Sequence, residues 1–305
     1  MIYRYGIWLF AWIWASAGLA QCLDHVVIGT WNTKHLGRAN FAYEDAGKLL
    51  ANLDLIALQE VNTTLAGKQA LIKLQHTLTQ QTGDLWCSII SGVPSGARER
   101  YAFLWRARTV TLGYTAAEIQ QAACPQAAER AGLQHFQAEE LVREPAGAYF
   151  FAPDDQRFIY LASVHLVPTA KKPEKEVPFL LKSMEAQVEA LRIPGLVAML
   201  AGDFNLASSH PAFKLWQNAA WHPALPGKVK TSLKQKQKAF SQAYDNVWWQ
   251  DFALGCAMSY EVINPYEVFP RKGSGEIYRE ISDHAPVAIY YKKVTPLPEP
   301  EDERP

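Results

Sequence analysis

Carboxylate, amide and imidazole side chains follow or adjoin apolar stretches at five places in this 305-residue chain. These places are Trp31–Asn32, Leu58–Glu60, Val164–His165, Gly202–Asn205 and Ser282–His284. Each apolar stretch is typical of a strand, so the polar groups are expected together at one edge of a sheet sandwich. Taken singly, each would be a solvated strand end, a turn residue or a structural histidine. Five in one chain indicate a site where oxygen ligands can hold a hard cation.

The elements that must position these groups are typical of one α/β domain without a Pro/Gly-rich linker. Apolar residues three and four apart predict helices at 41–52, 65–80 and 174–191. Short apolar runs predict strands at 25–29, 53–59, 85–90, 101–105, 110–114, 147–151, 158–165, 196–200, 244–249, 258–262 and 285–291. This order favours two packed sheets with helices outside.

Composition excludes several classes of protein. Hydrophobic residues make up 49% of the chain, enough to bury a core, which excludes a collagen-like repeat, wholesale disorder and a disulfide-only mini-fold. Thirty basic and thirty acidic residues give a formal net charge of zero. A nucleic-acid partner would therefore have to meet locally concentrated cations.

Both ends of the chain are expected to lie outside the folded domain, which we place at 21–293. Residues 1–20 carry one cation, Arg4, an apolar block and a small residue at Ala20, which predicts a signal peptide and a secreted or periplasmic protein. An uncleaved anchor and a lipoprotein at Cys22 are the alternatives. The acidic, proline-rich residues 294–305 predict a disordered tail.

Export would place the four cysteines in an oxidising compartment. Cys22, Cys87, Cys124 and Cys256 could then form two disulfides in any of three connectivities. The absence of Cys-x-x-Cys and His-x-x-His spacing argues against a structural zinc site.

Eight stretches of the sequence resemble the endonuclease/exonuclease/phosphatase superfamily, and within it the deoxyribonuclease I branch. They are TWNTKHLG (30–37), LIALQEV (55–61), RERYAFLWR (98–106), VREPAG (142–147), SVH (163–165), GDFN (202–205), AYDNV (243–247) and SDHAPV (282–287). The resemblance implies a four-layered α/β/β/α sandwich of two mixed β-sheets flanked by helices. It also implies a secreted, divalent-metal-dependent endonuclease that hydrolyses DNA with little sequence specificity. The alternatives are a phosphodiesterase or phosphatase acting on RNA or a lipid headgroup, a toxin-type nuclease subunit and a non-catalytic binding module.

The resemblance also implies the ligands of a metal ion, Mg²⁺ in the first place and Mn²⁺ or Ca²⁺ as alternatives. Glu60 would be the principal ligand, with Asp283 across the site. Asn32, Asp203 and Asn205 would complete the oxygen cluster around the metal and the scissile phosphate, and Asp203 and Asn205 would also take part in catalysis. This mixture of acids and amides suits Mg²⁺, which keeps several of its waters.

Two imidazoles are implied as the catalytic acid and base. His165 would be oriented by Glu99, and His284 by Asp245, because a carboxylate behind an imidazole fixes its tautomer and raises its basicity. Arg143 would hold a phosphate oxygen through its planar guanidinium, unless it only forms an ion pair with Glu99 or Glu144.

Departures from the family affect the expected substrate contacts. Asn62 and Ala97 stand where the family carries an Arg and a Tyr that enter the minor groove, and Lys34 replaces a phosphate-binding Arg. Phosphate contacts are therefore also expected from the lysine-rich segment that holds Lys228, Lys230, Lys234, Lys236 and Lys238. A solvated loop or a lysine-coated helix face is the alternative. The expected partner is DNA, bound by a monomer without stable membrane association.

Overall fold

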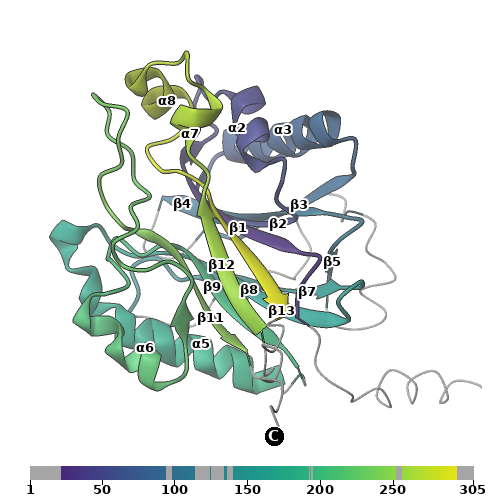
Figure 1. The fold of residues 1–305 in the computed structure, drawn as a ribbon, viewed down its shortest axis with the longest axis vertical. Coiled ribbons are helices and arrows are strands. Elements are labelled where there is room, and N and C mark those ends of the chain that lie inside the picture. Colours follow the sequence, from purple (N-terminus) through teal and green to yellow (C-terminus); the bar gives the residue numbers. More distant parts are fainter. Residues whose placement is uncertain are drawn as a thin grey trace, which may run out of the picture.

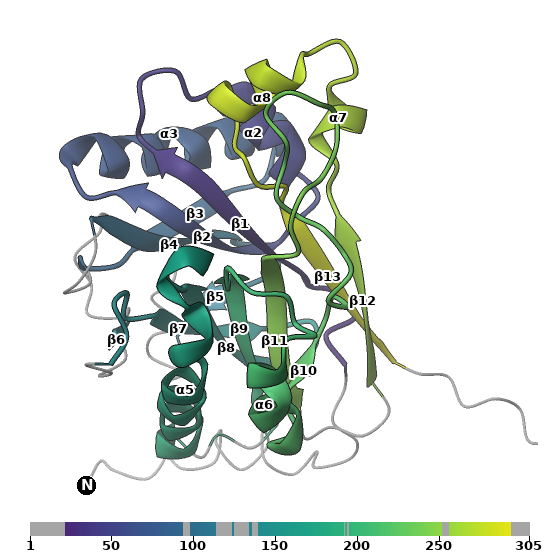
Figure 2. The same cartoon turned by 90° about the vertical axis from the view of Figure 1, so that its left-hand side faces the viewer.

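Two β-sheets packed face to face, with helices on both outer faces, form the described part of the chain (Figure 1). The computed structural model describes residues 22–93, 98–113, 124, 134–135, 140–191, 193, 195–251 and 256–293. Figure 2 shows the same layers from the side, with α2 and α3 (Tyr43–Leu50 and Leu65–Thr82) over one sheet and α5 and α6 (Val177–Leu191 and Lys214–Asn218) over the other. The four-layered α/β/β/α sandwich predicted from the sequence is confirmed.

The first sheet has the strand order β12-β13-β1-β2-β4-β3. Its strands are β1 (Val27–Leu36), β2 (Leu55–Asn62), β3 (Trp86–Ile90), β4 (Glu99–Arg106), β12 (Cys256–Val262) and β13 (Val287–Lys293). Strands β1 and β2 are parallel, and the other pairs are antiparallel. Helix α3 buries Ala70, Leu71, Leu74 and Leu78, spaced three and four apart, against this sheet. The helix ends at Gly83, whose left-handed φ of 74° suits glycine.

The second sheet has the order β10-β11-β9-β8-β7-β5, with β6 paired to β7. Its strands are β5 (Thr111–Leu112), β6 (Gln134–His135), β7 (Ala146–Ala152), β8 (Arg157–His165), β9 (Val197–Asp203), β10 (His222–Pro223) and β11 (Asp245–Asp251). Strands β8 and β9 are parallel, so this sheet is also mixed. All seven residues of β9 are buried, as expected for a strand that is covered on both faces.

Three hydrophobic clusters fill the spaces between the layers. The central cluster lies between the sheets, where the rings of Phe103 and Trp105 pack edge-on against Phe150. A second joins α2 and α3 to the first sheet, and a third joins α5 and α6 to the second sheet. Each sheet is therefore held on both faces, which fixes the ends of its strands.

Two disulfides link parts of the sandwich at the strand ends opposite the polar groups. Cys22 pairs with Cys256, and Cys87 pairs with Cys124, which selects one of the three possible connectivities. Cys256 and Cys87 lie at the start of β12 and β3, and their cross-strand partners Lys293 and Trp105 lie at or near the ends of β13 and β4. Both bridges therefore stabilise the scaffold from the far side.

Most expected elements are present, and the differences concern their ends and several short elements. Strands β1 and β9 continue through Asn32 and Asp203, so these residues lie on strands instead of after them. Helix α5 begins at Val177 because residues 173–175 form a 3₁₀ turn. The short α6, α7 (Pro265–Val268) and α8 (Ser274–Glu280) are not among the predicted helices, because so few residues carry little helical periodicity.

The predictions for the two ends of the chain fall on residues 1–20 and 294–305, which lie outside the described residues. Among the helices that the structure describes, none has the length and apolar character that a membrane span requires.

Candidate active site

The polar segments singled out in the sequence meet where strands of the two sheets end side by side. Within the second sheet, Asp203 at the end of β9 is the cross-strand partner of both His165 on β8 and Asp245 on β11. Within the first sheet, Asn32 on β1 pairs with Gln59, and Asn62 on β2 pairs with Glu99 on β4. The hydrogen-bond registers of both sheets thus bring residues from distant parts of the chain into one site.

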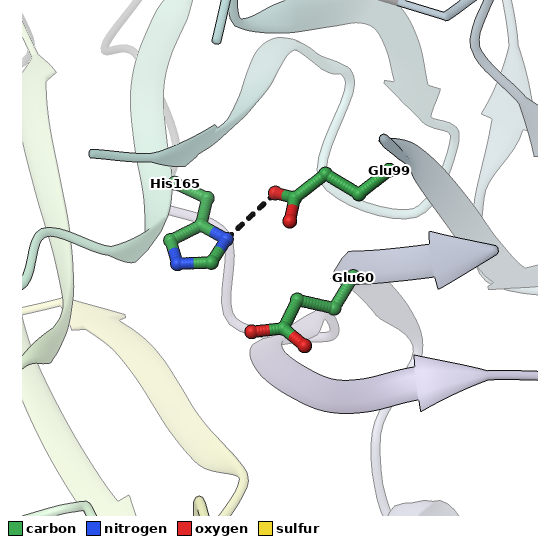
Figure 3. Close-up of side chains that lie close together, drawn as sticks. All are labelled: Glu60, Glu99 and His165. Atoms are coloured by element: carbon green, nitrogen blue, oxygen red, sulfur yellow. Dashed lines mark hydrogen bonds and ion pairs between the residues drawn. The ribbon is translucent and has the colours of Figure 1, made fainter. Parts of the chain in front are cut away.

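The first acid–imidazole pair joins the two sheets. Nδ1 of His165 lies 2.6 Å from Oε1 of Glu99, and both side chains are buried (Figure 3). Burial alone would raise the pKa of Glu99, but the charge and hydrogen bond of His165, with Arg143, hold it below its ordinary value. Burial would lower the pKa of His165, but Glu99 and Asp203 raise it above 6.5. The pair therefore favours a charged imidazole held against a carboxylate.

The second acid–imidazole pair has the same form. Nδ1 of His284 lies 2.7 Å from Oδ2 of Asp245, and Oγ1 of Thr231 donates to the same oxygen at 2.6 Å. Burial would lower the pKa of His284, but the charges of Asp245 and Asp203 and the hydrogen bond to Asp245 raise it to about 10. Trp31 also donates its indole N–H to the backbone oxygen of His284, at 2.9 Å. His284 is thereby held through both its ring and its backbone.

Both imidazoles face one carboxylate. Nε2 of His165 and Nε2 of His284 lie 3.6 and 3.7 Å from Oδ2 of Asp203. The same oxygen accepts a hydrogen bond from Asn32 Nδ2 at 3.1 Å. Asn205 donates its backbone N–H to the other oxygen of Asp203 at 2.8 Å, and its side chain donates to the carbonyl of Leu166. Asp203 is therefore the point at which both acid–imidazole pairs meet.

The acids and amides fit a divalent cation. Asn32 Nδ2 also donates to Glu60 Oε1 at 3.1 Å, which links Glu60 to Asp203. Ligand atoms of Glu60, Glu99 and His165 lie within 4.8 Å of one another, and so do those of Asp203, Asp245 and His284. In Figure 3 the Glu60 carboxylate lies beside the His165–Glu99 pair. One buried carboxylate oxygen, Asp245 Oδ1, has no hydrogen-bond partner among the described residues, so the donor set holds unused acceptor capacity.

Asp283, the expected ligand across the site, contacts a lysine. Its Oδ2 lies 3.7 Å from Nζ of Lys34, which also donates to the backbone oxygen of Tyr278 and lies 3.4 Å above that ring. Burial lowers the pKa of Lys34, while Asp283 opposes the shift. Lys34 therefore balances one of the acidic charges of the site.

Arg143 forms contacts inside the protein at the edge of the site. Its Nη1 donates to the backbone oxygens of His165 and Leu166 at 3.2 and 2.8 Å, and its Nε lies 3.6 Å from Glu99. An ion pair with Glu99, the alternative that the sequence left open, is thus present. The Arg143 guanidinium therefore lies beside the His165–Glu99 pair.

The lysine-rich segment forms an irregular hairpin and not a helix. Lys228, Lys230, Lys234, Lys236 and Lys238 are all exposed. The base of the hairpin is fixed to the site. Ser232 forms a β-bridge with His284, the Leu233 N–H donates to the backbone oxygen of Asp283, and the Ala285 N–H donates to the backbone oxygen of Thr231. The cations are therefore carried by a loop that is anchored on the His284 segment.

The two positions that depart from the groove-binding residues of the family have different outcomes. Asn62 turns back onto its own chain, because its Oδ1 accepts from the Thr64 N–H at 3.0 Å before α3 begins. Ala97 lies outside the described residues.

Two residues of the site, Thr231 and His35, carry no signal in the sequence. Thr231 stands among lysines with no pattern that marks it. Nδ1 of His35 lies 3.2 Å from Oε2 of Glu60, a contact that depends on a distortion of β1.

Lys34, His35, Glu60 and Asn205 all have left-handed φ values of 50–63°. Each such residue costs about 1–3 kcal/mol, and backbone strain of this kind collects at functional sites.

Comparison with known proteins relates this geometry to a known family. The model of the Endonuclease/Exonuclease/phosphatase family matches residues 29–284. A protein named deoxyribonuclease from Thioalkalivibrio sp. (strain K90mix) is 25% identical over 290 residues, which cover 91% of this chain and 73% of that protein.

Solved structures share the fold at low sequence identity. The mannosyl-6-phosphatase Bt3783 of Bacteroides thetaiotaomicron VPI-5482 superposes with a TM-score of 0.57 at 12% identity, covering 87% of this chain and 99% of that one. Truncated Caenorhabditis elegans TDP2 superposes with a TM-score of 0.56 at 17% identity, covering 88% and 97%.

Proposed function

We propose that this chain, which belongs to the Endonuclease/Exonuclease/phosphatase family, is a Mg²⁺-dependent deoxyribonuclease that acts outside the cytoplasm. The family consists of divalent-metal-dependent hydrolases. The observation that carries the proposal is the pair of acid–imidazole units from separate parts of the chain, both within 3.7 Å of Asp203. Two imidazoles that face one point suit a reaction that needs a base and an acid.

The chain supplies the groups for in-line hydrolysis of a phosphodiester. Glu60 and Asp203 would hold the cation, Asn32 links their carboxylates through its amide N–H groups, and Asn205 keeps Asp203 in place. When bound, the cation would neutralise the negative charge that develops on the phosphate. The imidazole that is neutral takes the proton of the attacking water, and the one that is charged gives a proton to the leaving 3′ oxygen. Glu99 and Asp245 hold the two rings at Nδ1, so that Nε2 of each ring faces the reacting groups.

DNA is the substrate that the remaining observations favour. The 25% identical relative is named deoxyribonuclease. The exposed lysines of the hairpin 228–238 offer phosphate contacts, which need no particular base sequence. Arg143 and Lys34 add positive charge at the edge of the site.

Hydrolysis of another phosphate ester is the second candidate function. Asn62 supports this candidate. Its side chain accepts a hydrogen bond from the Thr64 N–H and carries no positive charge that could enter a DNA groove. A fold neighbour is named as a mannosyl-6-phosphatase.

Action outside the cytoplasm is supported by the cysteines. All four form disulfides, which persist in oxidising compartments and are rare in the cytosol. Residues 1–20 have the composition of a signal peptide.

The test is a plasmid-nicking assay with the purified protein in Mg²⁺ and in EDTA, beside RNA, phosphoinositide and sphingomyelin. We expect supercoiled DNA to become nicked and then linear in Mg²⁺ only. Hydrolysis of one of the other substrates without any DNA cleavage would favour the second candidate. Nicking that persists in EDTA would contradict the metal-dependent mechanism.

A further inference from the structure

Strand β1 is distorted beside the main acidic residue of the site. Its pairing with β2 moves from Asn32↔Gln59 to Leu36↔Val61, so Thr33, Lys34 and His35 oppose the single residue Glu60. Bulges of this kind bend a strand and re-aim side chains next to active sites. The distortion therefore decides which side chain faces Glu60.

The distorted backbone is held in a defined conformation. Lys34 and His35 have left-handed φ values of 50° and 63°, and Glu60 has 58°. The guanidinium of Arg38 donates to the backbone oxygens of Thr33, Lys34 and Ile281. Two consecutive non-glycine residues in this region are uncommon. Arg38 thus holds this conformation locally and also links it to Ile281, far away in the sequence.

The result is an imidazole nitrogen beside a carboxylate. His35 Nδ1 lies 3.2 Å from Glu60 Oε2, while Glu60 Oε1 accepts from Asn32. Two neighbouring ligands of an octahedral cation, each about 2.1 Å from it, lie about 3 Å apart. The spacing of Nδ1 and Oε2 therefore suits two ligands of the same ion. The His35 side chain is 67% exposed, so a hydrogen bond alone would gain little from holding it there.

We propose that His35 supplies a nitrogen ligand to the divalent cation held by Glu60 and shifts the preference of the site from Mg²⁺ towards Mn²⁺. This inference rests on the proposed function, because it places the cation at Glu60. Imidazole is a good ligand for first-row transition metals, whereas Mg²⁺ prefers oxygen. The chain would then accept either ion but bind Mn²⁺ more tightly than an all-oxygen site would.

The test measures metal binding directly by calorimetry. The full-length protein, freed of metal with EDTA and dialysed, is titrated with MnCl₂ and with MgCl₂ as wild type and as His35→Asn. Asparagine tolerates left-handed φ, so this variant removes the imidazole and keeps the backbone. His76→Asn, at an exposed position of α3, is the matched control. We expect His35→Asn to raise the Kd for Mn²⁺ by at least ~10-fold and that for Mg²⁺ by less than ~3-fold, with His76→Asn unchanged for both ions.

A spectroscopic readout identifies the ligand atom. Pulsed electron paramagnetic resonance of the Mn²⁺-loaded protein should show ¹⁴N modulation from a bound imidazole in wild type and in His76→Asn. The modulation should be lost in His35→Asn. Modulation that survives in His35→Asn would overturn the assignment, as would equal weakening of Mn²⁺ and Mg²⁺ binding.

Failure of this inference can be distinguished from failure of the proposed function through Glu60→Gln. If Glu60→Gln leaves the binding of both ions unchanged, the cation is not held at Glu60 and both proposals fail at that point. If Glu60→Gln weakens both ions while His35→Asn affects both equally, only the role of His35 is contradicted.

Discussion

One oxygen of the Glu60 carboxylate accepts a hydrogen bond from Asn32, and the other faces His35. Replacing Glu60 with Gln removes the negative charge at a site that uses few anionic ligands. We predict that Glu60→Gln lowers DNA cleavage at ~1 mM Mg²⁺ by at least ~10²-fold and raises the Mg²⁺ concentration for half-maximal rate. Steady-state nicking over a range of Mg²⁺ measures both effects. An unchanged Mg²⁺ dependence would remove Glu60 from the ligand set.

His284 gives a prediction about pH. Its pKa is raised to about 10 by Asp245 and Asp203, against an ordinary value of 6.5. A group whose pKa is higher in the folded state stabilises the fold when it is protonated. For His284 this contribution is fully present below about pH 6.5 and is lost as the pH rises through about 10. In EDTA, wild type should have a larger unfolding free energy than His284→Gln. This difference should shrink as the pH rises from about 6.5 to about 10.

The measurement is urea denaturation at several pH values, with His76→Gln as the control on an exposed histidine. The difference between wild type and His76→Gln should not change with pH. A constant difference for His284→Gln as well would show that the imidazole is not held in its charged form.

The sequence predicted which residues belong to the site more readily than it predicted the contacts between them. The resemblance implied that Glu99 orients His165 and that Asp245 orients His284, and the structure places both pairs within hydrogen-bond distance. The position of Lys34 against Asp283 and the approach of His35 to Glu60 could not be predicted. They depend on the bulge in β1 and on Arg38, which no local pattern specifies.

Among the elements, the lysine hairpin is fixed at its base to the segment that holds Asp283 and His284, and its lysine side chains are exposed. Its cations suit phosphate binding. We predict that replacing Lys230, Lys234, Lys236 and Lys238 with Gln weakens DNA binding for all sequences alike. The salt dependence should become flatter by roughly one unit of log–log slope for each phosphate that is no longer bound. The rate at saturating DNA should change little.

Fluorescence anisotropy with labelled duplexes at several salt concentrations measures this slope. Lys182→Gln with Lys214→Gln, on the outer helices α5 and α6, is the control and should leave the slope unchanged. An unchanged slope in the hairpin variant would mean that the lysines are only a solvated surface. The substrate would then be sought among single strands, short oligonucleotides or other phosphodiesters.

Elements with strong periodicity could be predicted within a few residues, and short ones could not. The buried runs of β2, β8 and β9 are long enough to mark themselves. The hairpin carries cations but no alternation of apolar and polar residues, so the sequence does not distinguish a loop from a helix face. Its conformation depends on the β-bridges of Ser232 with His284 and of Leu233 with Phe240. No helical or strand periodicity in the sequence predicts these bridges.

At the scale of the whole molecule, the two disulfides lie at one end of the strands of the sandwich, and the site lies at the opposite end. They close loops of different length: Cys22–Cys256 spans 234 residues and Cys87–Cys124 spans 37. The chain-entropy model assigns them about 5.5 and about 4 kcal/mol of stabilisation. We predict that Cys22→Ser with Cys256→Ser destabilises the protein more than Cys87→Ser with Cys124→Ser.

Urea denaturation of the two double variants gives both unfolding free energies. Since both bridges lie away from the acid–imidazole pairs, the folded variants should keep the wild-type cleavage rate at room temperature. A large loss of rate at unchanged stability would mean that the bridges position the site instead of the scaffold. The disulfide pairing itself needed the fold, because spacing in the sequence allows three connectivities.

We propose that His165 and His284 act as the acid and the base in metal-dependent DNA hydrolysis by this protein. Single-turnover cleavage of a labelled duplex in Mg²⁺ by wild type, His165→Ala, His284→Ala and the control His76→Ala isolates this role. Near-ultraviolet circular dichroism should show that each variant is folded. We predict that each of the two site variants cuts at least ~10²-fold more slowly than wild type, the scale of general acid–base catalysis, while His76→Ala cuts normally. A near-normal rate in either folded site variant would contradict the assignment.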